Sequence, residues 1–388
     1  MNDKILYIVA TEFQLLTVLN LHINRNILRK ADLLLITSSF ANIQGILDRL
    51  EKENIFEHIF SSNMININSL KTVIGKVYNI FFQSFLSSSY YFNVNNKIFN
   101  ISNYLDIYCW HEPFIKLFNT IPLKNRNKLQ NRINLHRFDE GTASYLPALL
   151  NKYNVDEIHL YNSLDEVMFC HLKEKYKNIK AKADIPKLSF YDTAFLSLLK
   201  RIFKYESDSF LFSKNSILFF EQPYSSQEII DFISRYLSLI SKLIKELNQD
   251  IPIYVKKHPR SGLGKINYYE LGWTVIDNYI PIGVPWELAL LTKSRKNTNS
   301  LLLLSLSSTA VFSHKLYFKD SINIHCCLLA NLVKNCELQL SYSNKISEEL
   351  MLLINSISLR YPDIFIPDTT REFEEYIKLW CDITQEGE

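Results

Sequence analysis

Short, continuous apolar runs alternate with longer stretches of helical periodicity along this chain. In the first half the apolar runs are Ile5–Val9, Leu33–Ile36, Ile107–Cys109 and Ile133–Leu135. Helical patterns occupy Phe13–Leu21 and Ile43–Leu50 between them. A strand that is apolar throughout is typical of a parallel sheet covered by helices on both faces. The pattern therefore predicts an α/β fold built from βα units.

The same alternation restarts in the second half. The strands predicted there are Ile217–Phe220, Ile253–Lys257, Trp273–Ile276, Leu301–Leu306 and Ile322–His325. Ile229–Leu247 and Glu348–Ile357 have the pattern of amphipathic helices, and a lysine-rich stretch, 179–215, has helical character near Ala194–Phe203. A chain of 388 residues is long enough for two domains. We expect domains at 1–210 and 211–388, with ligands outside the carboxyl ends of the strands.

The composition excludes several classes of function. The 43 basic and 40 acidic side chains give a net charge of only +3, too balanced for an obligate nucleic-acid binder. With 8 glycines, and neither GxGxxG nor GxxxxGK[ST], the chain has no dinucleotide or P-loop signature. HExxH, GxSxG, a clear DxD and clustered Cys/His are also missing, which favours a reaction without metal or cofactor.

The cysteines and the N-terminal segment bear on location. Six cysteines are scattered without a CxxC pair, and we expect buried, reduced thiols: Cys109, Cys170, Cys326, Cys327, Cys336 and Cys381. The first residues lack the pattern of a signal peptide, and no run of eighteen apolar residues occurs. The expected location is the cytoplasm.

The first motif with chemical potential is Arg-Phe-Asp-Glu-Gly-Thr, directly after the strand predicted at Ile133–Leu135. Asp139 and Glu140 place two carboxylates where the strand ends, and Gly141 lets the chain turn. A carboxylate at the ligand-facing edge of a sheet can act as a general base. The structural alternative is a solvated turn ahead of a helix.

The second motif, Lys-Lys-His-Pro-Arg, closes the strand predicted at Ile253–Lys257. His258 has a side chain that titrates near neutral pH, and Pro259 stiffens the turn. Lys257 and Arg260 add positive charge, which suits a ligand carrying phosphate. Taken alone, the motif fits an exposed basic turn equally well.

The third motif, Ser-Leu-Ser-Ser-Thr-Ala, follows the apolar run of the strand at Leu301–Leu306. Hydroxyl and backbone N–H groups of Ser307, Ser308 and Thr309 would form a small anion-binding nest at a strand-to-helix turn. Paired serines occur elsewhere in the chain, so the value of this motif lies in its position.

An acidic pair with glycine, then His-Pro, then Ser-Ser, in this order, resembles the motifs of bacterial sialyltransferases. The pattern is shared by polysialyltransferases and by the lipooligosaccharide sialyltransferases of glycosyltransferase family 52. The FDEGTASYL and KKHPR segments and the opening Tyr7–Gln14 look most similar to family 52. The resemblance implies a GT-B-like α/β enzyme, with two Rossmann-type domains facing across a cleft. It would transfer sialic acid from CMP-sialic acid with inversion and without metal.

The resemblance also implies roles for single residues. Glu140 or Asp139 looks like the base that deprotonates the acceptor hydroxyl, and Glu221 could share or replace that role. His258 looks like the group that protonates or charge-stabilises the departing CMP phosphate. Glu287 follows a proline and would either hold ribose hydroxyls or merely begin a helix. The other expected substrate contacts are Gly141, Lys257, Pro259, Arg260, Ser307, Ser308, Thr309, Thr11 and Gln14.

Two alternatives to sialyl transfer stay open at this point. The same scaffold could use another nucleotide sugar such as CMP-Kdo, or the chain could be a non-catalytic partner in glycan assembly. The expected partners are a nucleotide-sugar donor, mainly on the 211–388 domain, and a glycan acceptor of lipooligosaccharide or capsule on the 1–210 domain. A lipid-linked acceptor would bring the protein to the inner face of the plasma membrane. The aromatic stretch Tyr78–Phe92 is either core with an exposed loop or a membrane or acceptor patch.

Overall fold

The protein is described from a computed structural model. Its described residues are 4–37, 40, 42–62, 91–94, 97–100, 103–110, 115, 133–151, 155–164, 179–206, 214–222, 226–247, 250–258, 266–292, 299–320, 323–336 and 344–385. The chain divides into two compact units, each treated by itself below. Unit 1 comprises Met1–Leu164, Lys173–Pro186 and Arg201–Phe203, and unit 2 comprises Asp165–Leu172, Lys187–Lys200 and Lys204–Glu388.

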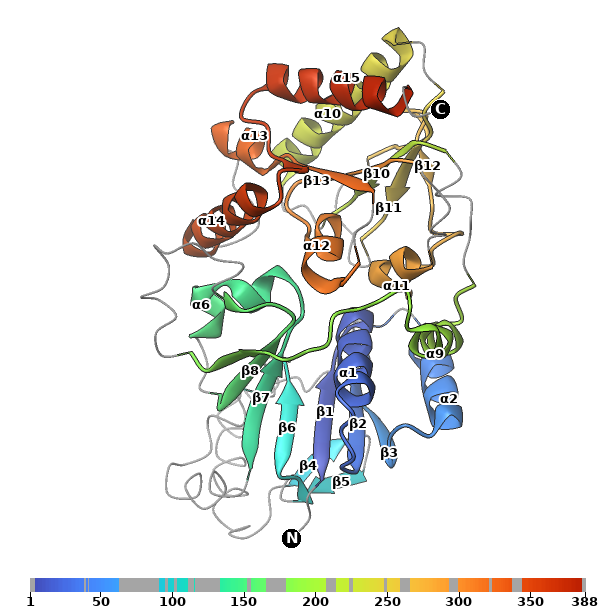
Figure 1. Ribbon diagram of the computed structural model, residues 1–388, viewed down its shortest axis with the longest axis vertical. Helices are drawn as coiled ribbons and strands as arrows, with labels where there is room; N and C mark the ends of the chain where they lie inside the picture. The colour runs from blue at the N-terminus through green and yellow to red at the C-terminus, as the bar shows by residue number, and fades with distance from the viewer. Residues whose placement is uncertain are drawn as a thin grey trace. The chain divides into compact units, whose positions relative to one another are not determined.

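Unit 1 is built around a parallel sheet of seven strands in the order β3-β2-β1-β6-β7-β8-β9 (Figure 1). The bounds are β1 Ile5–Val9, β2 Ala31–Ile36, β3 His58–Ser62, β6 Asp106–Cys109, β7 Asn134–Phe138, β8 Glu157–Leu160 and β9 Ala181–Ala183. Its helical elements are α1 Glu12–Asn24, α2 Ile43–Glu53, the 3-10 helix η4 Thr142–Tyr145 and α6 Pro147–Leu150. Strands β4 Tyr91–Val94 and β5 Lys97–Asn100 form a separate antiparallel pair.

Unit 2 repeats this plan with a parallel sheet of six strands in the order β12-β11-β10-β13-β14-β15. The strands are β10 Ser216–Phe220, β11 Ile253–Lys256, β12 Thr274–Val275, β13 Leu301–Ser305, β14 Ile324–Leu328 and β15 Ile364–Phe365. The helices are α10 Gln227–Glu246, α11 Trp286–Leu291, η7 Thr309–Val311, α12 Ser313–Tyr317, α13 Ala330–Asn335, α14 Asn344–Arg360 and α15 Thr370–Gln385. Helix α9, Thr193–Phe203, begins among residues of unit 2 and ends among residues of unit 1.

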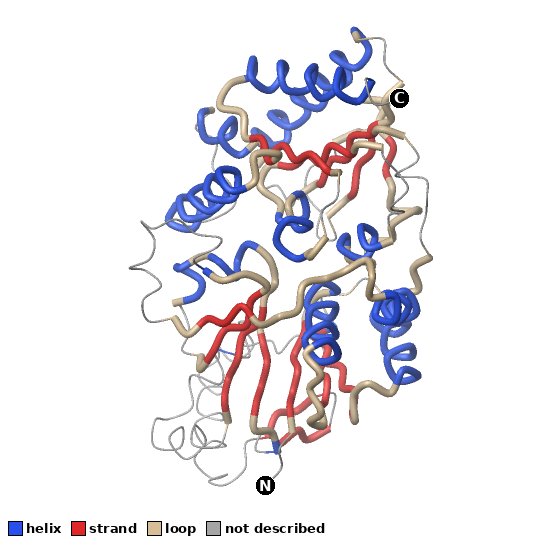
Figure 2. Tube along the Cα trace, viewed as in Figure 1, coloured by secondary structure: helices blue, strands red, loops and turns tan. Residues whose placement is uncertain are grey.

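Apolar side chains of helices and strands interlock in the core of unit 2. Ser226 caps the N-terminus of α10, and the apolar side of this helix packs with Phe373, Ile377 and Trp380 of α15. Figure 2 shows these two helices side by side, with the strands beneath them. All five residues of β10 are buried, as a strand covered on both faces requires.

Counting the strands of each sheet along the chain, unit 2 has the doubly wound order 3-2-1-4-5-6, and unit 1 has the same order with a seventh strand, β9, beyond the sixth. In this order the first three strands follow one another towards one edge of the sheet, and the later strands are added on the other side of the first strand. The switch lies between β1 and β6 in unit 1 and between β10 and β13 in unit 2. Ligands of doubly wound sheets bind outside the carboxyl ends of the strands at this switch point. The predicted α/β class with two Rossmann-type domains, as in GT-B enzymes, is confirmed.

The structure corrects several details of the predicted elements. Strand β7 runs from Asn134 to Phe138, later than predicted, so Arg137 and Phe138 lie within the strand. Strands β3, β8 and β9 were not predicted, because they lie towards the sheet edges and contain polar or charged residues. Cys336, expected to be buried, is exposed just after α13, whereas Cys109, Cys326, Cys327 and Cys381 are buried as expected. Cys170 and most of Tyr78–Phe92 lie outside the described residues.

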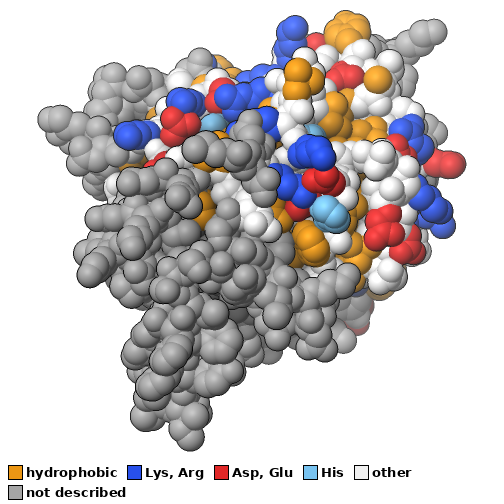
Figure 3. Space-filling view, turned by 90° about the horizontal axis from the view of Figure 1, so that it is seen from below, with side chains coloured by type: hydrophobic (Ala, Val, Ile, Leu, Met, Phe, Trp, Pro, Cys, Tyr) orange, Lys and Arg blue, Asp and Glu red, His pale blue; other side chains and the backbone are white. Residues whose placement is uncertain are grey.

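Two further observations concern the hydropathy of the helices and the charged side chains on the surface. Among the described helices, none has both the length and the hydropathy of a membrane span. Figure 3 shows that basic and acidic side chains are interspersed over the described part of one face.

Candidate active site

The loops after β1 and β7 meet in unit 1. Thr11 caps α1 by accepting a hydrogen bond from the Gln14 N–H at 3.2 Å, a role typical of threonine at this position. The Gln14 side chain is buried, and its oxygen accepts a hydrogen bond from Ala10 N at 2.8 Å. Its amide nitrogen donates to a carboxylate oxygen of Glu140. Gln14 therefore orients Glu140 from the neighbouring loop.

The two adjacent carboxylates of the acidic motif have different surroundings. Asp139 is fully buried and accepts hydrogen bonds from the Tyr145 hydroxyl, from Tyr161 N at 3.3 Å and from Gly141 N at 3.0 Å. Burial, and then the charge of Asp139, raise the pKa of Tyr145, so its hydroxyl keeps the donated proton. Asp139 thus fixes the turn.

Glu140 is only partly buried. Its backbone N–H donates to the Ser144 hydroxyl oxygen at 2.7 Å, which holds the turn, while its side chain extends to Gln14. Of the two carboxylates, Glu140 is the one that solvent reaches. Proton transfer from a bound hydroxyl therefore fits Glu140 better than Asp139.

Gly141 has backbone angles of φ 121° and ψ −157°. This region of conformational space is essentially restricted to glycine. The glycine of the motif is therefore required by the backbone, since it turns the chain from β7 into η4 directly behind Glu140.

In unit 2, polar side chains join the two strands that flank the switch point. Gln222, just after β10, accepts hydrogen bonds from Ser307 N at 3.0 Å and from the Ser305 hydroxyl at 3.3 Å. Its amide nitrogen also lies 3.4 Å from the Ser307 hydroxyl oxygen. The Ser307 N–H, predicted as part of an anion nest, is therefore used to link the ends of β10 and β13.

Glu221 holds the turn that carries His258. One oxygen of this buried carboxylate accepts the Tyr268 hydroxyl at 2.8 Å, and the other accepts the backbone N–H of His258 at 3.3 Å. The Glu221 N–H also bonds to Lys256 O at 3.1 Å, continuing the β10–β11 ladder. Glu221, named as an alternative base, is thus placed to position His258.

The remaining predicted residues of unit 2 lie around the same strand ends. Ser308 caps η7, accepting from Ala310 N at 3.3 Å, and Thr309 is the first residue of that short helix. Lys257 and His258 are partly buried after β11. Pro259 and Arg260 lie outside the described residues.

Glu287 is a buried carboxylate in the first turn of α11. Burial raises its pKa to about 7, although its own backbone N–H, the Ser313 hydroxyl and the nearby charge of Lys256 oppose the rise. Lys256 is itself buried and donates to Ile280 O at 3.2 Å. A buried acid that titrates near neutral pH is a candidate for a functional site, in keeping with the predicted ribose contact.

Replacing Glu287 by glutamine is expected to stabilise the protein near neutral pH. The folded state disfavours the ionised carboxylate, so wild-type stability falls as the pH rises from the unfolded pKa of 4.5 to about 7, a range that corresponds to roughly 3 kcal/mol. Thermal unfolding at several pH values measures this: the gain of Glu287→Gln over wild type should be small near pH 4, grow up to pH 7 and then level off. A gain that does not vary with pH would contradict this account.

The structure adds residues that sequence reasoning did not name. Tyr145 and Ser144 lie inside the FDEGTASYL segment, so their nearness to the motif was the available signal. Tyr161, Gln222 and Tyr268 carried no such signal, because they meet the motifs only through the fold.

Comparison with known proteins bears on the family of the chain. Comparison with curated proteins found no match. Among solved structures, a complex of MnaA from S. aureus with UDP has a TM-score of 0.41 at 12% identity, covering 92% of this chain and 88% of that one. The wall teichoic acid polymerase TagF with CDPG has a TM-score of 0.41 at 11% identity, covering 100% and 90%. A putative UDP-N-acetylglucosamine 2-epimerase from Listeria monocytogenes has a TM-score of 0.43 at 10% identity, covering 92% and 89%.

The family itself follows from the sequence match. The family model described as alpha-2,8-polysialyltransferase (POLYST) matches residues 5–328, which include all three motifs and the first strand of each sheet. The likeness to polysialyltransferases is confirmed, whereas the closer likeness to family 52 stays a prediction. The chain belongs to the alpha-2,8-polysialyltransferase family and is a glycosyltransferase.

Proposed function

We propose that this protein transfers sialic acid from CMP-sialic acid to a galactoside or sialoside acceptor, with inversion and with no metal in the reaction. Its family favours a sialoside as acceptor. The observation that carries the proposal is the pair of adjacent side chains, the buried Glu221 and the partly buried Gln222, that place His258 and Ser307 around one switch point. Such a site is suited to the phosphate of a nucleotide sugar.

On the acceptor side, Glu140 takes the proton of the attacking hydroxyl. Gln14 fixes the direction of the carboxylate, while Asp139 and Gly141 fix the turn that carries it. As the hydroxyl oxygen forms its bond to the anomeric carbon, its proton passes to Glu140. Asp139 is a positioning residue in this scheme.

On the donor side, the bond between the anomeric carbon and the CMP phosphate oxygen breaks, and its electron pair stays on the phosphate. His258 neutralises the charge that develops there, by donating a hydrogen bond or a proton, and Lys257, Ser308 and Thr309 contribute further contacts. Stabilising charge where it appears in the transition state lowers the barrier directly. Glu221 acts through His258 as a positioning residue.

Substitution of His258 by alanine is expected to lower kcat by at least about 100-fold, because the departing phosphate loses its cationic partner. CMP release is measured under saturating donor and acceptor. His58→Ala, which removes a largely exposed histidine of unit 1, is the matched control and should retain wild-type kcat. If His258→Ala has the same kcat as wild type, His258 has no role in the reaction.

Comparing donors tests the proposed function as a whole. Purified protein is incubated at 20 °C in EDTA with CMP-sialic acid or CMP-Kdo, each with and without a sialoside or galactoside acceptor. We expect acceptor-stimulated release of CMP from CMP-sialic acid. If CMP is released only from CMP-Kdo, then CMP-Kdo is the donor and the proposed donor is wrong. If CMP is released from neither compound, a non-catalytic role in glycan assembly is the better explanation.

A further inference from the structure

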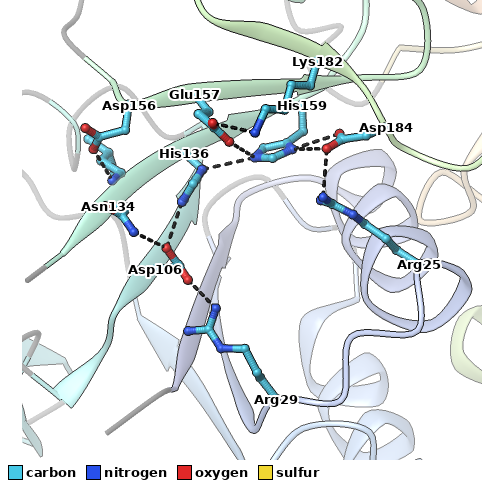
Figure 4. Close-up of polar contacts among 11 residues, drawn as sticks. Arg25, Arg29, Asp106, Asn134, His136, Asp156, Glu157, His159, Lys182 and Asp184 are labelled. Carbon is cyan, nitrogen blue, oxygen red and sulfur yellow. Dashed lines mark hydrogen bonds and ion pairs between the residues drawn. The ribbon is translucent and has the colours of Figure 1, made fainter. Parts of the chain in front are cut away.

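A row of six connected side chains crosses one face of the unit 1 sheet, with two histidines at its centre, an aspartate on either side of them and an arginine at each end (Figure 4). The row consists of Arg29, Asp106, His136, His159, Asp184 and Arg25. It includes Asp106, the first residue of β6, whereas Glu140 lies beyond the last residue of β7. None of the row's contacts is used by the proposed reaction.

The two carboxylates fix the tautomers of the two histidines. His136 Nε2 lies 3.0 Å from Asp106 Oδ1, and His159 Nδ1 lies 2.9 Å from Asp184 Oδ1. A carboxylate only accepts hydrogen bonds, so each of these ring nitrogens carries a hydrogen.

The other two ring nitrogens therefore face each other with their lone pairs. His136 Nδ1 and His159 Nε2 are 3.1 Å apart, and both side chains are nearly buried. Two facing lone pairs repel unless a positive species lies between them. That species is either a shared proton or a metal ion.

A third side chain points to a metal ion. Glu157, the partner of His136 in the β7–β8 ladder, has Oε2 3.9 Å from His159 Nε2, while its Oε1 is paired with Lys182 at 2.6 Å. One ligand atom each from His136, Glu157 and His159 can be chosen so that all lie within 4.8 Å of one another. Zn²⁺ with ordinary bond lengths and tetrahedral geometry needs ligand separations of about 3.3 Å. The separations of 3.1 Å between the two ring nitrogens and 3.9 Å between Glu157 and His159 are close to this value, and a shared proton would make no use of Glu157.

The surrounding groups match what metal ligands require. A ligating histidine usually donates its second ring N–H to a carboxylate, which orients the ring and increases its basicity. Both histidines do so here, through Asp106 and Asp184, and Arg29 and Arg25 hold those carboxylates in turn.

We propose that His136 Nδ1, His159 Nε2 and the Glu157 carboxylate bind one Zn²⁺ ion, with water as the fourth ligand. The ion fastens β7 to β8 and takes no part in sugar transfer. It adds a structural site to the metal-free reaction predicted from the sequence.

A second cluster of similar composition shows why the proposal is specific. Asp32, Glu57 and His58 also bring potential ligand atoms together. There the Lys4 ammonium lies 2.8 Å from Asp32, 2.6 Å from Glu57 and 3.2 Å from His58 Nδ1, so a cation of the chain itself contacts all three side chains. In the proposed site Lys182 pairs with Glu157 Oε1, and the other oxygen, Oε2, is the one near His159. A substitution at His58 is therefore a matched control.

The test uses the full-length protein after EDTA treatment and dialysis, titrated with ZnCl₂ against a competing chelating dye. We expect one equivalent to bind, and the melting temperature to rise by about 5 °C or more at a hundredfold excess over Kd. His136→Gln and Glu157→Gln should each weaken binding at least about tenfold, whereas His58→Ala should bind like wild type. Glu157 is partly exposed, so its variant stays informative if His136→Gln does not fold.

Three outcomes would overturn the proposal: no saturable binding, equal binding by wild type and Glu157→Gln, or loss of binding in His58→Ala. If Zn²⁺ does not bind saturably and the melting temperature depends on pH but not on Zn²⁺, a proton shared by His136 and His159 would explain their close contact instead. Sugar transfer at 20 °C is measured in the same samples and is expected to be equal with and without Zn²⁺. The metal site and the proposed function can therefore fail separately.

Discussion

Replacing Glu140 by glutamine is expected to lower kcat for sugar transfer by about 10²- to 10⁴-fold, the usual contribution of a general base. Glutamine has nearly the same shape and can still accept the hydrogen bond from Gln14. It cannot take a proton from the acceptor hydroxyl. The loss should therefore appear in kcat, with donor binding and the free energy of unfolding close to those of wild type.

The control for this variant is Glu51→Gln, which makes the same change on the exposed side of α2. Transfer is followed as sialylated acceptor formed per enzyme per second, and donor binding by calorimetry. Glu140→Gln with kcat within about threefold of wild type would remove Glu140 as the base. In that case Glu221→Gln would be tested next, because Glu221 is the other carboxylate predicted for the role.

Replacing the neighbouring residue, Asp139, by alanine is expected to act mainly on stability. The change leaves the Tyr145 hydroxyl and the backbone N–H groups of Tyr161 and Gly141 without their shared acceptor in a buried setting. Each buried donor left without a partner costs about 1–3 kcal/mol, so we expect the free energy of unfolding to fall by about 3 kcal/mol or more. Urea denaturation measures the loss.

The conservative variant Asp139→Asn separates this structural role from a catalytic one. Its single amide oxygen can still accept some of the bonds, so its stability should lie between those of wild type and Asp139→Ala. Its kcat at a temperature where it is fully folded should stay well above that of Glu140→Gln. Equal and large losses of kcat in Asp139→Asn and Glu140→Gln, with stability unchanged, would contradict the division of roles.

The sequence was informative about the fold wherever a strand is buried on both faces. β1, β2, β10 and β13 read as continuous apolar runs, and each was predicted close to its observed bounds. β8 was missed because Glu157 and His159 interrupt its apolar pattern. These two side chains are held by charged partners that come from other parts of the chain, and local periodicity carries no record of them.

The same limit applies to the candidate site. The positions of Glu140, His258 and Ser307 at strand ends could be predicted, because each motif follows an apolar run. Their supports could not, because Gln14 lies 126 residues from Glu140, and Gln222 lies 85 residues from Ser307. Which of two adjacent carboxylates is buried was likewise decided by groups that only the fold brings near, above all the backbone N–H of Tyr161.

Proton NMR of a single reaction mixture tests the central claim most directly. Wild-type protein, CMP-sialic acid and a sialoside acceptor are followed in EDTA until the first product accumulates. The account predicts that free CMP and sialylated acceptor form in equal amounts, that the new linkage has the anomeric configuration opposite to that of the donor, and that both signals are nearly lost in Glu140→Gln and His258→Ala. A product with the donor's configuration, or no product from CMP-sialic acid, would contradict it.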